Sequence, residues 1–153
     1  MKLASALHSL ETFFAKLGGW LQAPLLLVLR LHWGWAFAQT GWGKLTHLDR
    51  TAGFFESLHI PAAKLNAVMA GSTECLGGTL LLLGLCTRFA TPALVFTMIV
   101  AYATAEREAL TTIFSDPDKF TGAAPFLFLL AALTVFAFGP GKLSLDALLR
   151  KKG

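Results

Sequence analysis

The sequence predicts an all-α, polytopic membrane protein, an antiparallel bundle of four transmembrane helices with an N-terminal amphipathic interfacial helix. Two observations support this fold class. Of the 153 residues, 55% are hydrophobic and only 14% are charged, whereas about 25% of the residues in a soluble domain are charged. In addition, four apolar segments approach the roughly 20 residues that a helix needs to cross a bilayer. A backbone in lipid must satisfy its own hydrogen bonds, which favours helices for all four.

The first expected element is an amphipathic helix at about residues 3–17. Apolar side chains recur there at intervals of three and four residues, namely Leu3, Leu7, Leu10, Phe14 and Leu17. This spacing places them on one face of a helix that lies in the plane of the membrane interface. A cleaved signal peptide is the alternative, but His8 and Glu11 interrupt the continuous apolar region that it requires.

The four spans are expected at about residues 20–43, 65–87, 88–106 and 120–139, within a single membrane domain of residues 1–153. Trp20 and Trp42 bracket the first span, and 22 helical steps correspond to about 33 Å. That length is close to the separation of the two interfacial aromatic belts.

The loops and the basic residues set the expected orientation. Residues 45–63 mix charged and aromatic side chains, which predicts a short interfacial helix or a re-entrant turn. Both termini and the second loop share one side, with seven basic residues: Lys2, Lys16, Arg88, Lys142, Arg150, Lys151 and Lys152. The opposite side has five: Lys44, Arg50, Lys64, Arg107 and Lys119. The excess predicts cytoplasmic termini for a multi-pass protein of the cell (inner) membrane.

Polar side chains at membrane depth are the candidate functional residues, because they are costly to place there. The first span holds Arg30 and His32, the second holds Glu74 and the third holds Tyr102. Glu74 is within reach of Arg30 or His32 if the two spans pack side by side. Three interpretations remain open: an ion pair that sets helix register, a ligand or proton-relay site, or a snorkelling Arg30 beside a protonated Glu74.

Small residues support close packing of the first two spans. They recur at helical intervals in both segments, at Gly34, Ala38 and Gly41 and at Gly71, Cys75 and Gly78. Such residues allow two backbones to approach closely in lipid.

The cofactor expectations are mostly negative. No metal-binding cluster, phosphate loop or hydrolase motif is present, so no metal or intrinsic cofactor is expected. His32 is the only histidine in a span, so a haem would require a second subunit. Tyr102 offers a hydroxyl donor to a quinone carbonyl, or acts as an interfacial aromatic. The basic residues are scattered rather than clustered, which argues against a nucleic-acid partner.

Four motifs in chain order carry a resemblance to a known family. They are Arg30-Leu31-His32-Trp33-Gly34-Trp35-Ala36-Phe37 followed by Gly41-Trp42-Gly43-Lys44-Leu45; Phe54-Phe55-Glu56 with Ile60-Pro61; Glu74, Gly77 and Gly78 with Leu83-Gly84-Leu85-Cys86-Thr87-Arg88; and Gly139-Pro140-Gly141-Lys142-Leu143-Ser144-Leu145-Asp146. Together they resemble the DoxX family of four-span bacterial and archaeal membrane proteins. By matching positions, the polar signature residues are Arg30, Lys44, Glu74, Arg88 and Asp146.

The resemblance implies an association with redox chemistry, because some relatives are subunits of thiosulfate:quinone oxidoreductases. The first functional hypothesis is therefore a membrane subunit or partner of a quinone-linked redox system. It expects a quinone pocket between the first two spans, lined by Trp33 and Phe37, and a redox-enzyme partner or a homo-oligomer in the lipid bilayer. The alternatives are a non-catalytic anchor or assembly factor for a peripheral enzyme and a small-solute carrier that works as an oligomer. Whether the chain is itself an enzyme stays open.

Overall fold

The computed structural model describes residues 2–151, with side chains described from Leu7 onward. All regular elements among these residues are helical, which confirms the all-α prediction. The longest helices are α1 (Lys2–Thr46), α3 (Ala63–Leu83), α4 (Thr87–Thr104) and α7 (Pro125–Phe138). Four short helices connect or follow them: α2 (Leu48–Ser57), α5 (Arg107–Thr111), α6 (Pro117–Gly122) and α8 (Leu145–Arg150).

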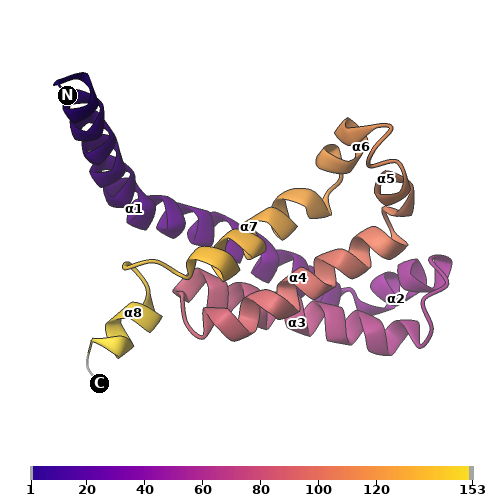
Figure 1. Cartoon of the computed structure of the whole chain (residues 1–153). Coiled ribbons are helices and arrows are strands. Elements are labelled where there is room, and N and C mark those ends of the chain that lie inside the picture. Colours follow the sequence, from indigo (N-terminus) through magenta and orange to yellow (C-terminus); the bar gives the residue numbers. More distant parts are fainter. Residues whose placement is uncertain (1, 152–153) are drawn as a thin grey trace.

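The long helices form a ring in which each packs against its neighbours. Helix α1 packs most extensively on α3, α3 contacts α4, α4 contacts α7, and α7 closes the ring against α1. Figure 1 shows α2, α5 and α6 at one end of this bundle and α8 at the other. The buried centre holds Phe37, Leu81, Leu94, Met98, Ala132 and Val135.

Helix α1 differs from the expected division into an interfacial helix and a separate span. It runs without a break for 45 residues, or about 67 Å, and its N-terminal part extends away from the bundle (Figure 1). Gly18 and Gly19 do not end the helix, since the helical hydrogen bonds continue past them. Pro24 lies inside it, where the ring removes one backbone donor and favours a bend rather than a stop.

The close approach of α1 and α3 confirms the prediction from the small residues. A methyl group added at Gly34 would lie 2.6 Å from the backbone N of Leu82, and one at Gly78 would lie 2.5 Å from the backbone N of Ala38. A methyl group at Gly41 would overlap the backbone N of Cys75. Backbone therefore meets backbone along the whole contact, in the manner of small-residue helix pairs in lipid.

The turn between α3 and α4 ends one helix and starts the next within three residues. Gly84 has a left-handed φ of 66°, and the N–H groups of Gly84 and Leu85 donate to the carbonyls of Leu81 and Leu80. This arrangement satisfies the last carbonyls of α3 and reverses the chain.

The four-span arrangement stays a prediction. Within residues 2–151, one helical segment, Leu7–Thr46, is long and apolar enough to cross a membrane by length and composition. Helix α7 is apolar but has 14 residues, or about 21 Å, which is shorter than a hydrocarbon core of about 30 Å.

We expect Gly41→Ala to destabilise the fold by about 1–3 kcal/mol, because the added methyl group meets the α3 backbone, which cannot shift as a side chain can. Gly43→Ala is the matched control two residues along the same helix, since nothing lies within 4 Å of its methyl position. It should be neutral or stabilise by up to about 1 kcal/mol. Thermal unfolding of the detergent-purified proteins measures both, and equal melting temperatures would contradict the backbone contact.

Candidate functional site

A buried ion pair joins α1 to α3. Lys44, in the last turn of α1, donates to the Glu74 carboxylate near the middle of α3. The Glu74 side chain is 3% exposed and that of Lys44 is 29% exposed. The pair is therefore removed from solvent on the carboxylate side, where an unpaired charge would be costly.

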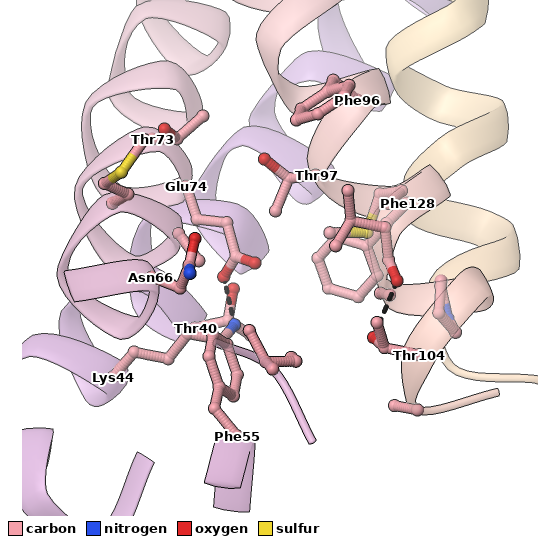
Figure 2. Close-up of a pocket in the computed structure, with 18 of the residues that line it drawn as sticks. Thr40, Lys44, Phe55, Asn66, Thr73, Glu74, Phe96, Thr97, Thr104 and Phe128 are labelled. Carbon is pink, nitrogen blue, oxygen red and sulfur yellow. Dashed lines mark hydrogen bonds and ion pairs between the residues drawn. The ribbon is translucent and has the colours of Figure 1, made fainter. Parts of the chain in front are cut away.

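A cavity of about 490 Å³ opens beside this pair. Residues of α1, α2, α3, α4 and α7 line it, and most of its lining is apolar. Figure 2 shows the Glu74 carboxylate pointing into the cavity from one wall, with Phe96 and Phe128 on the opposite wall and Phe55 below. The arrangement combines a mostly apolar volume with one charged pair, which is the usual composition of a small-molecule site.

Most of the neutral polar side chains in the cavity donate hydrogen bonds to backbone carbonyls. The hydroxyls of Thr40, Thr97 and Thr104 each donate to the carbonyl three or four residues earlier, at 2.7–3.0 Å. The Asn66 side-chain amide donates to the Pro61 carbonyl at 2.7 Å. Each hydroxyl thus keeps acceptor capacity, while the Lys44 ammonium, with three N–H groups, is the strongest donor facing the cavity.

The expected partners of Glu74 are wrong. Glu74 pairs with Lys44 rather than with Arg30 or His32. Arg30 lies 14 residues before Lys44 on one helix, or about 21 Å away along the axis. An ion pair between α1 and α3 therefore exists, but its cation is Lys44.

The backbones of α1 and α3 touch at Gly34, Gly41 and Gly78, which leaves no room there for the expected pocket between these two helices. Of the two aromatics expected to line it, Phe37 is fully buried in the core and its ring meets Phe128 edge-to-face at 4.7 Å. Trp33 contacts Phe128 in the same way at 4.9 Å. These ring contacts join α1 to α7. Phe128 also lines the cavity, whereas Trp33 and Phe37 do not.

Arg30 occupies the α8 end of the bundle. It is 1% exposed, it donates through Nη2 to the Leu143 carbonyl, and its guanidinium lies against Gly84, where a Cβ would overlap it. Its Nε and Nη1 are buried without a hydrogen-bond partner among the residues that the structure describes. Arg30 therefore holds the segment before α8 against the α3–α4 turn.

Asp146 completes this junction. Its carboxylate accepts hydrogen bonds from the backbone N–H groups of Cys86 and Thr87, at 2.9 and 3.2 Å, and from the Thr87 hydroxyl at 3.0 Å. It thus caps the N-terminus of α4 from a distant part of the chain. Partial burial acts to raise the pKa of Asp146, but these hydrogen bonds and the charge of Arg150 outweigh it, so the pKa lies below its ordinary value.

The other three predicted site residues have separate environments. Arg88 is exposed in the first turn of α4. His32 is exposed on α1 and its ring meets Trp33 edge-to-face at 4.9 Å. Tyr102 is buried, donates its hydroxyl to the Phe120 carbonyl at 2.7 Å, and stacks on the Phe120 ring. The Tyr102 hydroxyl is thereby engaged within the protein rather than directed at a ligand.

Several cavity residues are not predicted from the sequence. Phe96, Thr97 and Phe128 lie on α4 and α7 in uniformly apolar stretches, where no local pattern marks them. Asn66 is different, since a lone amide at the start of an apolar segment is a detectable signal. No group of three or more His, Cys, Asp or Glu suited to a metal ion occurs within the part of the chain that the structure describes.

Comparison with known proteins agrees with the sequence motifs. The DoxX family model matches residues 25–107. The chain belongs to the DoxX family. It is also 33% identical over 141 residues to the uncharacterized membrane protein Rv3486 of Mycobacterium tuberculosis, with 84% of this chain and 83% of the relative covered. No solved structure matches.

The DoxX match identifies the chain as a membrane protein. The polar residues that carry the resemblance fall into two groups in the structure. Lys44 and Glu74 meet at the cavity, whereas Arg30 and Asp146 meet the α3–α4 turn, with Arg88 beside it. The DoxX signature thus marks two separate places in the bundle.

We expect Lys44→Met to destabilise the protein by about 3 kcal/mol, because it leaves a buried carboxylate without its partner. Lys44→Met combined with Glu74→Gln should recover much of this loss. Unfolding in detergent, arranged as a double-mutant cycle, measures the coupling. The exposed Lys64–Asp49 pair, at 3.2 Å, is the matched control and should show less than about 1 kcal/mol. Additive effects at Lys44 and Glu74 would contradict the buried pair.

Acid should weaken the Asp146 cap. Because the pKa of Asp146 is lowered by folding, its carboxylate stabilises the fold above the unfolded value of about 3.9. That stabilisation is lost as the pH falls through the lowered pKa. The melting temperature of Asp146→Asn should therefore lie furthest below that of the unaltered protein at neutral pH, and this difference should shrink below about pH 4. Glu56→Gln, at an exposed site in α2, is the control; a pH-independent Asp146→Asn difference would refute the cap.

Proposed function

We propose that this DoxX-family protein binds the headgroup of a membrane quinone in the cavity beside Lys44 and Glu74, as the membrane subunit or partner of a quinone-linked redox system. The observation that carries the proposal is the cavity itself, an apolar volume of about 490 Å³ with one buried ion pair on its wall. Ligand pockets typically enclose about 300–1,000 Å³ with a few polar groups.

The chemistry of the pair suits a quinone. A quinone ring presents carbonyl acceptors, and the Lys44 ammonium is a charged donor that faces the cavity (Figure 2). Reduction to the quinol adds two electrons and two protons. In this proposal the electrons come from the redox cofactor of a partner enzyme, and both protons come from water. The Lys44 ammonium passes one proton to a ring oxygen, and Glu74, once protonated from the aqueous side, passes the other. No cofactor resident in this chain is required, and a haem would need a second subunit.

The membrane placement belongs to the same proposal. Helices α1, α3, α4 and α7 are the four spans, in the cell (inner) membrane. Around the α2, α5 and α6 end lie six acidic residues, Asp49, Glu56, Glu106, Glu108, Asp116 and Asp118, and four basic ones, Arg50, Lys64, Arg107 and Lys119. The α8 end carries Arg88, Lys142, Arg150 and Lys151 with one acid, Asp146. Acidic residues contribute little to orientation. Counted over the whole sequence, seven basic residues lie on the side of the termini and five, with Lys44 included, on the other, and this excess supports cytoplasmic termini.

Photolabelling with an azido-quinone in nanodiscs tests the binding site. We expect label on α4 and α7 near Phe96 and Phe128, displaced by excess short-chain ubiquinone. Lys44→Met should weaken displacement roughly ten-fold, the usual loss for one hydrogen bond to a charged group. Lys64→Met, which removes an exposed lysine, is the control. Labelling that is unsaturable, or that is unchanged by Lys44→Met, would overturn the proposal.

Two other outcomes would support the alternative functions instead. Solute flux in proteoliposomes that depends on Glu74, without quinone binding, would indicate a carrier. A soluble enzyme that co-purifies through residues 106–119, and is indifferent to Glu74, would indicate an anchor or assembly factor.

A further inference from the structure

A second cavity lies at the α8 end of the bundle, away from the Lys44–Glu74 pair. It has a volume of about 380 Å³ and lies between α1, the first turn of α4 and the segment that leads from α7 into α8. Its wall includes Gly139 and Gly141, whose left-handed φ values of 77° and 80° bend the chain around the opening. We call this cavity the basic groove.

Three cations line the basic groove, namely Arg88, Lys142 and Arg150. All three side chains are exposed, and none forms an ion pair with any residue from Leu7 to Lys151. The one acidic residue in the lining, Asp146, already accepts three hydrogen bonds from Cys86 and Thr87. The Asp146 carboxylate offsets one of the three cations, so the lining of the groove keeps a net positive charge within the described chain.

A fourth cation lies behind the groove wall. Arg30 donates to the carbonyl of Leu143, which stands between the lining residues Lys142 and Ser144. The Arg30 guanidinium is buried, and its Nε and Nη1 have no hydrogen-bond partner within the described part of the chain. A charge in such a low-dielectric position adds to the positive potential of the groove more strongly than an exposed charge would.

Large exposed apolar side chains occur on the same elements that line the groove, and one of them, Phe138, is part of the lining. Trp20 and Leu21 on α1 are 86% and 57% exposed, and Phe138 at the end of α7 is 68% exposed. Leu148 and Leu149 on α8 are exposed as well. An anion with apolar chains matches this surface better than a free anion does, because the chains would cover side chains that otherwise face outward.

We infer that the basic groove binds the headgroup of an anionic phospholipid. The phosphate oxygens lie among Arg88, Lys142 and Arg150, and the acyl chains run along α1 and the end of α7. Basic pockets between helices on the cytoplasmic side are suited to such headgroups. The inference rests on the proposed membrane placement of the α8 end but not on quinone binding, since it concerns the other end of the molecule and different side chains.

A bound lipid would also fasten α8 to α1 and to the start of α4. The lining residues come from α1, the start of α4 and α8, so one headgroup touches all three. A ligand that binds only this folded arrangement stabilises it in proportion to its saturation.

Native mass spectrometry of the full chain in detergent, with phosphatidylglycerol or zwitterionic phosphatidylcholine added, tests the inference. We expect phosphatidylglycerol to bind at least about ten-fold more tightly than phosphatidylcholine, because each cation near an anionic headgroup contributes roughly five-fold. The triple variant Arg88→Gln, Lys142→Gln, Arg150→Gln should lose this preference. Equal preference in the triple variant and the unaltered protein would overturn the assignment.

The matched control removes the same charge from the opposite end of the bundle, through Arg50→Gln, Lys64→Gln and Arg107→Gln, and should keep the preference. Inorganic phosphate and glycerol 3-phosphate are then added as water-soluble competitors of the lipid. If either at millimolar concentration displaces the lipid, the groove is a free-oxyanion site and the lipid assignment fails. Should the triple variant not fold, Arg88→Gln alone should reduce the preference roughly five-fold, and no reduction would again overturn it.

Discussion

The backbone contact between α1 and α3 is the constraint on which the rest of the structure depends. Glycines at positions 34, 41 and 78 bring the two helices so close that no side chain fits between them. This contact sets the register that places Lys44, three residues after Gly41, opposite Glu74. It also excludes a ligand from the space between these helices, so the available volume opens on the other side of Glu74, toward α4 and α7.

The bundle contains two clusters of charged residues, and their charges are balanced in different ways. Lys44 and Glu74 neutralise each other across α1 and α3 and face a mostly apolar cavity. Arg30 forms no ion pair with any acidic residue that the structure describes, and it donates one hydrogen bond to a backbone carbonyl. Asp146 accepts hydrogen bonds from the backbone N–H groups of Cys86 and Thr87 instead. The first group is a closed ion pair at a cavity, and the second is a junction between chain segments that leaves net positive charge around it.

Much of the fold was predictable from the sequence, because it depends on local pattern. Apolar segments, the glycine spacing and the rarity of charged residues predict the helices and the close pair. The partner of Glu74 was not predictable in the same way, since it depends on the register of two helices. A shift of one helical turn exchanges Lys44 for another neighbour. The continuity of α1 through Pro24 and the engagement of Tyr102 by Phe120 likewise depend on tertiary contacts.

The Asp146 cap has a consequence for the order in which the protein matures. The N-terminus of α4 receives its carboxylate from a residue 60 positions later than Cys86. During synthesis, the hairpin of α3 and α4 therefore emerges with the leading amides of α4 uncapped, and they must be hydrated or loosely bonded until α7 has followed. The amides of Cys86 and Thr87 gain the Asp146 carboxylate only when the C-terminal segment docks, so this junction closes after the last part of the chain has been made.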